Sequence, residues 1–236
     1  MKTWLENNKV YFETVAPVFI SIAALLVSVS SFMLTNQQLD LAKVEHQPNI
    51  YLKESYLYDE KLQSAYETEL RVINTGAEIS NFSQKVRSLL ELEFYTDTGK
   101  YATYLPIYGY YDTSFRSSEP TGELVLVKGY MNNTLFHNLY VQTLSSDFND
   151  KYGTVFVKLI HGTQVSYVSK LGENRNEYFV DKTHATKEQF DSLFANYDSF
   201  RPVELNKVTS QQLGEKVLEF RAQLEKSHNK LLKSDS

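Results

Sequence analysis

Residues 14–34 read TVAPVFISIAALLVSVSSFML, and this stretch decides how the chain is organised. No charged residue occurs between positions 14 and 39. As an α-helix, a run of this length spans about 30 Å, which is the thickness of the hydrocarbon core of a bilayer. Pro17 falls in the first turn, where its missing N–H costs no hydrogen bond. We therefore predict a transmembrane helix over residues 14–38 in a single-pass protein of the cell (inner) membrane.

Two other interpretations of this stretch are a buried helix of a soluble protein and a cleaved signal peptide. Buried helices seldom run for about twenty residues without a charge. A signal peptide has a shorter apolar region and a small-residue cleavage site, and no clear site of that kind precedes polar sequence here. The region before the apolar run also carries Glu6 and Glu13. A membrane anchor is the favoured interpretation.

The flanks of the apolar run carry little information on orientation. Residues 1–13 contain Trp4, Tyr11 and Phe12 beside lysines, which predicts an N-terminus at the membrane interface; an ordinary chain end is the alternative. The N-terminal flank has two lysines and the α-amine, against Lys43 and then Lys53 on the other side. This difference favours a domain outside the cell only weakly, so the side of the domain stays undetermined.

Four small residues recur at helical spacing within the apolar run. They are Ala24, Ser28, Ser31 and Thr35, so one face of the helix carries all of them. Small residues let helix backbones approach closely, and hydroxyls can bond across the contact. This face predicts a homo-oligomer formed through the transmembrane helix. The alternative is that these residues simply face lipid.

Beyond the membrane segment we predict a short stalk helix over residues 39–47 and an antiparallel β domain over residues 48–182. Pro48 ends the stalk, because the residue before a proline favours extended geometry. Leu90, Leu92 and Phe94 alternate with Glu91 and Glu93, the pattern of a half-buried strand. Further strands are predicted over residues 49–58, 69–76, 123–128, 139–143, 154–161, 164–170 and 177–181, with a tight reversal at residues 161–163. Many short strands separated by turns indicate an antiparallel β-sandwich or barrel.

Residues 183–236 are predicted to be helical. A short helix should cover residues 187–200 with Thr186 as its N-cap, and a longer one, with Ser210 as its N-cap, should run to about residue 233. The longer helix carries an apolar stripe formed by Leu213, Val217, Phe220 and Leu224. This stripe predicts docking on the β domain; pairing with another helix is the alternative.

The chain resembles one loosely defined group of proteins. Residues 70–81 read LRVINTGAEISN, residues 147–153 read DFNDKYG, and Gln47-Pro48 separates the helical region from the first strand. In these features the chain is similar to uncharacterised bacterial single-pass membrane-anchored proteins with an immunoglobulin-like β-sandwich domain, whose strands end in Asn-x-Gly and whose later hairpin looks like residues 147–153. The resemblance implies a fold and no particular activity.

The sequence contains no recognised catalytic motif. Cysteine is absent, so thiolate chemistry and disulfides are excluded, and the five histidines lack the spacing of a zinc protease. His137 and His161 fall on predicted strands, where a metal pair is possible in principle, but a solvated or satisfied residue is the favoured interpretation. Glu91 and Glu93 are assigned to a solvent-facing strand edge rather than to acid–base catalysis. No Gly-x-Ser-x-Gly elbow or phosphate-binding glycine loop occurs. We predict a protein that is not an enzyme and has no cofactor and no metal.

Charge and aromatic content bear on the partners. The net charge of −5 disfavours binding to genomic nucleic acid, which requires a basic surface. A tyrosine-rich stretch over residues 101–111 offers stacking faces, and a cation follows in a predicted surface loop over residues 112–121. The candidate ligand-binding residues are Tyr104, Tyr108, Tyr110, Tyr111 and Arg116. The alternative is a strand that uses tyrosine for its β propensity.

Two functions are compatible with these features. The first is a membrane-tethered, non-enzymatic binding protein that presents its β domain to an unknown protein or envelope partner at the lipid bilayer. The second is a ligand-gated membrane effector, similar in architecture to antiviral-defence proteins, in which a cytoplasmic β domain senses a small signal such as a cyclic oligonucleotide. Clustered transmembrane helices would then disrupt the membrane.

Overall fold

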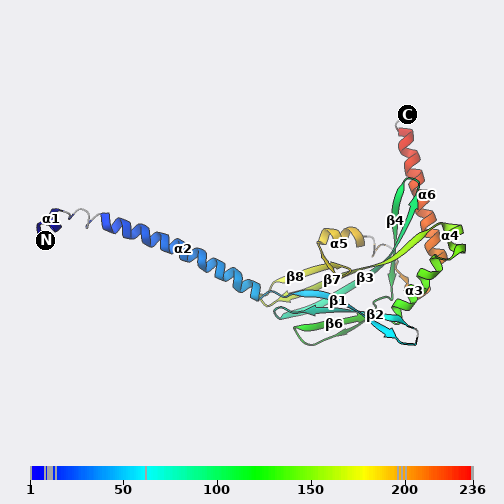
Figure 1. Cartoon of the computed structure of the whole chain (residues 1–236), viewed down its shortest axis with the longest axis horizontal. Helices are drawn as coiled ribbons and strands as arrows, with labels where there is room; N and C mark the ends of the chain where they lie inside the picture. The colour runs from blue at the N-terminus through cyan, green and yellow to red at the C-terminus, as the bar shows by residue number, and fades with distance from the viewer. Residues whose placement is uncertain are drawn as a thin grey trace. The chain divides into compact units, whose positions relative to one another are not determined.

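The computed structural model describes residues 2–7, 9, 13, 15–61, 63–195, 197, 199 and 201–234 (Figure 1). It divides into two compact units, Met1–Gln47 and Pro48–Ser236. The predictions made for Tyr11 and Phe12 and for the start of the anchor at Thr14 lie outside the described residues. Residue 200, the predicted last residue of the helix that begins at residue 187, also lies outside the described residues.

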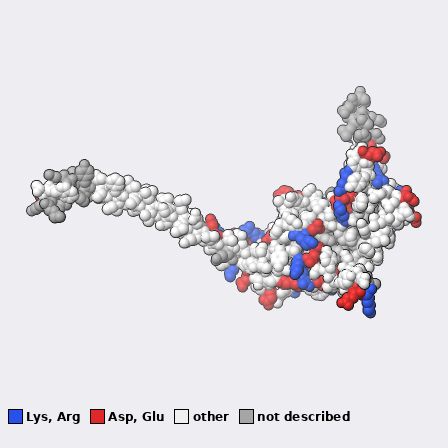
Figure 2. Space-filling view, viewed as in Figure 1, with Lys and Arg blue, Asp and Glu red and all other residues white. Residues whose placement is uncertain are grey.

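The first unit contains the helices α1 (Lys2–Asn7) and α2 (Ala16–Glu45). Pro17 lies in the first turn of α2, and the helix ends before Pro48, as the sequence predicts. The predicted anchor and stalk form one continuous helix, because the polar residues after Thr35 keep helical geometry. The side chains of residues 17–44 are exposed, and Figure 2 shows no charged residue along most of the helix. The helix is long and apolar enough to cross a membrane.

The second unit is built on two sheets. In the described residues, one sheet has four antiparallel strands in the order β1 (Ile50–Asp59), β2 (Ser64–Asn74), β6 (Gly122–Lys128) and β5 (Thr113–Arg116). The other has the order β10 (Val203–Glu204), β4 (Gly99–Tyr108), β3 (Ile79–Thr96), β7 (Val155–Ser169), β8 (Asn174–Val180) and β9 (Thr183–Ala185). Among the described strands of this sheet, β10 and β4 pair in parallel and the others pair antiparallel. The predicted combination of one apolar helix with a mainly antiparallel β domain is thus confirmed.

Residues of both sheets and three helices contribute to one buried core. Leu90, Leu92 and Phe94 of β3 are completely buried on one face of the strand, as their alternation predicts, and share a cluster with Leu70 and Val72 of β2. The helices α3 (Asn132–Thr143), α4 (Ser146–Tyr152) and α6 (Ser210–Ser234) contact one another beside the sheets (Figure 1). Their buried side chains extend the same cluster, so the C-terminal helix belongs to the second unit.

The segment between β6 and β7 differs from the prediction. The predicted strand over residues 139–143 is part of α3, and the predicted hairpin at residues 147–153 is α4, which Ser145 caps by accepting a hydrogen bond from the Phe148 N–H. Asn132, completely buried, ties α3 to β2 by bonding both the N–H and the C=O of Thr68. His137 therefore lies on a helix and not on a strand. A short apolar run fits a buried strand or a helix equally well, and long-range contacts decided the outcome.

The predicted reversal at residues 161–163 is also wrong, because β7 continues through these positions. Gly162 is a mid-strand residue whose missing side chain makes room for α5 (Lys187–Phe194). A Cβ at Gly162 would lie 2.4 Å from the Phe194 ring and 2.8 Å from the Phe190 ring. Glycine therefore marks a close packing contact here, whereas the sequence alone suggested a turn.

The start of α5 follows the prediction, whereas its end and the N-cap of α6 differ from it. Thr186 caps α5 in a capping box with Gln189, as predicted for its start, but the helix ends at Phe194. The N-cap of α6 is Thr209 rather than Ser210: its hydroxyl accepts from the Gln212 N–H, and the Gln212 side chain accepts from the Thr209 N–H. A short 3-10 helix, η2 (Leu205–Lys207), joins β10 to α6. The predicted docking of the α6 stripe is confirmed by the complete burial of Leu213 and Val217.

Candidate functional site

The five residues predicted to bind a ligand lie in three separate places. Tyr104 and Tyr108 are partly exposed on β4, and their hydroxyls donate to Glu91 and Glu204. Tyr110 and Tyr111 are buried in the core. Arg116 is exposed on β5, in the other sheet. The five residues therefore do not share one surface, because the chain leaves one sheet after Tyr108, passes through the core and enters the second sheet at residue 113, and their role in ligand binding stays a prediction.

The small residues of α2 keep the helical spacing that the sequence indicates. The Ser28 hydroxyl donates to the carbonyl of Ala24 at 2.8 Å, and the Thr35 hydroxyl donates to the carbonyl of Ser31 at 2.9 Å. Both hydroxyls therefore have partners within their own helix, as is common for Ser and Thr in apolar helices. Association through this face does not need them as donors and stays a prediction.

A buried polar cluster lies among the core residues. The Ser88 hydroxyl is 2.9 Å from Nδ1 of His161, and the rings of Tyr110 and Tyr111 lie 4.7 and 4.8 Å from the His161 ring. Burial lowers the pKa of His161 to about 4, so the imidazole is neutral at pH 7. A serine beside a histidine suits nucleophilic catalysis only where a substrate can reach it. Because both side chains are buried, we assign the pair to the core.

The carboxylate of Glu54 connects this cluster to the surface. It accepts a hydrogen bond from the Tyr111 hydroxyl at 3.2 Å and pairs with the Lys182 ammonium at 2.8 Å. The charged group that enters the core is therefore neutralised by a lysine. No group of three or more His, Asp or Glu side chains is placed to hold a metal ion in the part of the chain that the structure describes.

Glu93 does not lie at a strand edge, in contrast to the prediction for Glu91 and Glu93. It is on β3, which has β4 on one side and β7 on the other. Its carboxylate pairs with Lys100 at 2.7 Å and with Lys158 at 2.8 Å. Hydrogen bonds from Lys100 and then Lys158 lower the pKa of Glu93. Both lysines come from neighbouring strands, so this is an ion-pair cluster across the sheet.

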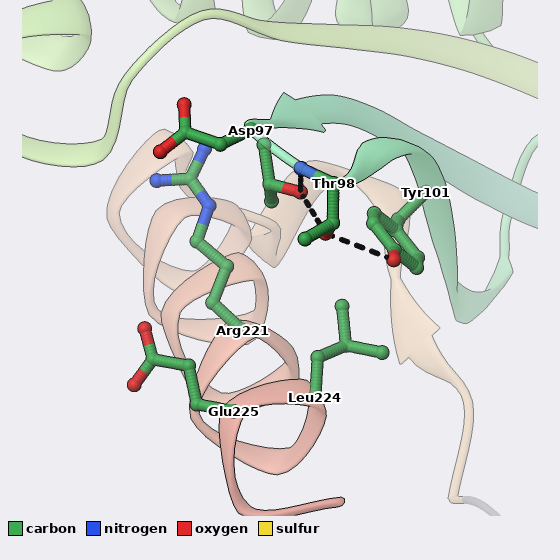
Figure 3. Close-up of a pocket in the computed structure, with 7 residues that line it drawn as sticks. Asp97, Thr98, Tyr101, Arg221, Leu224 and Glu225 are labelled. Atoms are coloured by element: carbon green, nitrogen blue, oxygen red, sulfur yellow. Dashed lines mark hydrogen bonds between the residues drawn. The ribbon is translucent and has the colours of Figure 1, made fainter. Parts of the chain in front are cut away.

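One cavity lies between the β3–β4 hairpin and α6 (Figure 3). It has a volume of about 390 Å³. The hairpin and α6 are more than a hundred positions apart in the sequence, and the docking of α6 brings them together. The lining residues are Thr96, Asp97, Thr98, Tyr101, Arg221, Leu224 and Glu225.

The hairpin wall of the cavity is a chain of hydroxyl groups. The Thr96 and Thr98 hydroxyls are 2.8 Å apart, and the Thr98 hydroxyl is 3.1 Å from that of Tyr101 (Figure 3). The Thr96 hydroxyl also accepts from the Thr98 N–H, which fixes the turn. The ring of Tyr101 stacks on Phe94 at 6.2 Å. The wall is therefore polar and held in place by the strands.

The helix wall contributes a guanidinium that is anchored but has no acidic partner. Nη1 of Arg221 donates to the carbonyl of Tyr152 at 2.9 Å, and its Cζ lies 5.0 Å from the centre of the Phe94 ring. Among the described residues, no carboxylate lies within 4.0 Å of this group, although Asp97 and Glu225 line the same cavity. Both carboxylates are exposed. The cavity thus offers one fixed positive charge, with negative charges at its rim.

Sequence reasoning did not find this cavity. Leu224 stood out only as part of the apolar stripe of the C-terminal helix, and neither Arg221 nor Asp97 was singled out. No local pattern links a turn to a helix more than a hundred residues later. Comparison with known proteins adds no information: no protein-family model and no curated protein matches the chain.

Proposed function

We propose that this chain is a single-pass, membrane-anchored binding protein that holds its second unit at the surface of the inner membrane. The observation that carries this proposal is α2. Between Val18 and Leu34, eleven large apolar side chains are exposed, and none of the helix's most apolar window is buried against the rest of the chain. Each such side chain left in water costs about 1.5–3 kcal/mol. A cost of that size means that these side chains must lie in an apolar environment. The hydrocarbon core of a bilayer provides one, and its thickness matches the length of the apolar run.

The second unit, in this proposal, is a β-sandwich domain of the immunoglobulin-like kind rather than a barrel. Support comes from the two separate strand orders, each with its own edge strands, because a closed barrel would have no edges. Residues of both sheets share one core, which is what two packed sheets require. Anchoring concentrates such a domain near partners in the same membrane or envelope.

The ligand-gated effector remains the alternative, but its predicted ligand residues are dispersed over both sheets and the core. It requires the second unit to be cytoplasmic, whereas the lysines at the ends of α2 favour the outside weakly. The test is a fusion after Ser236 to a reporter that works only outside the cytoplasm. Activity of this reporter would remove the alternative.

The anchor is tested by fractionating cells that express the full chain. We expect the protein in the membrane pellet, resistant to high salt and released by detergent. Replacing both Leu26 and Val27 by arginine should move the protein to the supernatant, because each arginine at a helix centre costs roughly 2.5–3.5 kcal/mol of insertion free energy. Leu218→Arg is the control, since Leu218 is an exposed leucine of the second unit. Recovery of the unmodified chain in the supernatant without detergent would contradict the proposal.

A further inference from the structure

We propose that the cavity between the β3–β4 hairpin and α6 binds a small zwitterion of the amino-acid class, with the carboxylate of the ligand on Arg221 and its ammonium facing the rim, where Asp97 and Glu225 lie. The inference rests on the binding role proposed for the second unit, and it names the ligand class of that role. It is independent of the membrane anchor.

The positive subsite is the guanidinium of Arg221. Its contacts with the Tyr152 carbonyl and the Phe94 ring hold it in one orientation. A guanidinium presents several N–H donors in a fixed fork, which matches the two oxygens of a carboxylate. Nη2 has no partner among the residues that the structure describes, so it is available to a ligand. Because the Arg221 side chain is already ordered, binding a ligand to it costs little additional side-chain conformational entropy.

The negative subsite is formed by two carboxylates from different elements. Asp97 is in the turn between β3 and β4, and Glu225 is one helical turn beyond Arg221. Neither has an ion-pair partner in the described part of the chain. A simple anion would meet these two carboxylates, and a simple amine would meet the guanidinium. A ligand with both charges satisfies all three groups, so the charge pattern selects a zwitterion.

The remaining walls limit the size of the ligand. Leu224 and the ring of Tyr101 provide apolar surface for a side chain, and the hydroxyls of Thr96 and Thr98 add further hydrogen-bonding groups. A volume of about 390 Å³ lies near the lower end of the range for small-molecule sites, about 300–1,000 Å³. One amino acid or a dipeptide fits that size.

The test uses the full chain in detergent micelles. The melting temperature is measured with each of the twenty standard L-amino acids at millimolar concentration. Any compound that raises it is titrated by calorimetry beside two relatives: its amide, which lacks the carboxylate, and its des-amino acid, which lacks the ammonium. We expect at least one amino acid to bind, and both relatives to bind at least about tenfold more weakly.

Variants locate the binding. Asp97→Asn and Glu225→Gln change exposed side chains and should weaken binding of the amino acid at least about tenfold while leaving its des-amino relative unaffected. Arg221→Lys should weaken the amino acid and the des-amino acid together. Glu219→Gln, an exposed acid-to-amide change elsewhere on α6, is the control and should leave the affinity unchanged.

Three results would overturn the proposal. They are no binding by any of the twenty amino acids, equal binding of the amide and the amino acid, and an affinity that Asp97→Asn and Glu225→Gln do not alter. A lower melting temperature for Asp97→Asn with unchanged binding would instead make Asp97 a structural partner of Arg221. If the chain sediments with membranes but binds no amino acid, only this inference is contradicted. If the chain binds an amino acid but does not sediment with membranes, only the proposed membrane anchor is contradicted.

Discussion

The imidazole of His161 is buried, and its surroundings strongly disfavour its protonation. It lies against Ser88 and two tyrosine rings, and the charged groups near it are Glu54 and Asp181, whose carboxylate accepts a hydrogen bond from the backbone N–H of His161. Burial lowers the pKa of His161 to about 4, and the charge of Glu54 opposes this only in part. Burial also raises the pKa of Asp181, which works in the opposite direction at acid pH.

Stability should therefore depend on pH through His161. The unfolded chain takes up this proton near pH 6.5, whereas the folded chain takes it up near pH 4. The folded state binds fewer protons in that window, so stability is full above about pH 6.5 and falls as the pH decreases to 4, by about 3 kcal/mol. Urea unfolding at a series of pH values measures this slope.

Two variants isolate the contribution of His161. His161→Asn should flatten the slope between pH 4 and 6.5 relative to the unmodified chain, whatever its effect on stability at pH 7. His137→Asn changes an exposed imidazole on α3 and should keep the original slope. Equal slopes for His161→Asn and the unmodified chain would contradict this account of the buried imidazole.

At the scale of elements, α6 shows how a contact can reverse an intrinsic preference. Gly214 lies between the buried residues Leu213 and Val217, on the side of the helix that faces α4. A Cβ at this position would lie 2.4 Å from the Tyr152 ring. Glycine weakens a helix by about 1 kcal/mol relative to alanine, yet here it permits the close approach of two helices. The same contact positions Arg221 against Tyr152 and the cavity.

Gly214→Ala should consequently destabilise the protein, although alanine is the better helix former. The added methyl group overpacks the contact with Tyr152, and overpacking typically costs about 1–3 kcal/mol, more than the gain in helix propensity. The midpoint of urea unfolding measures the effect. Gln223→Ala, at an exposed position of the same helix, should leave the midpoint nearly unchanged or raise it slightly. A higher urea midpoint for Gly214→Ala would show that the gain in helix propensity outweighs the overpacking against Tyr152.

At the scale of the whole molecule, the two units have different sources of stability. The second unit has a core built from its own strands and helices. The first is a helix whose exposed apolar side chains find no partner core among the described residues. Folding of the second unit should thus not require the first, and solubility of the full chain should be limited by α2.

Removing residues 1–47 should leave a soluble protein that unfolds cooperatively without detergent. Its melting temperature should match that of the second unit in the full chain in micelles, since no core residue has been removed. Calorimetry of both forms measures this. Aggregation of residues 48–236 in water, or a much lower melting temperature, would mean that the core extends beyond this unit.

The elements that the sequence predicted correctly are those whose pattern lies within a single segment of the chain. The uncharged run of α2, the alternation around Leu92 and the N-cap at Thr186 were predicted correctly, because spacing along the chain encodes burial and hydrogen bonding directly. The errors occurred where one local pattern fits two structures. The run at residues 139–143 became helix because buried Asn132 ties α3 to β2, and Gly162 allows a ring to pack rather than the chain to turn.

The sequence by itself determined that this chain has an apolar helix exposed for most of its length and a mainly β unit after Pro48, since hydrophobic period and charge distribution are properties of neighbouring residues. Only the tertiary structure decided that Tyr104 and Tyr110 lie apart and that Asp97 and Arg221 line one cavity. The reason is that contacts between distant segments depend on how β3, β4 and α6 pack together. No periodicity within any one of these segments records that arrangement.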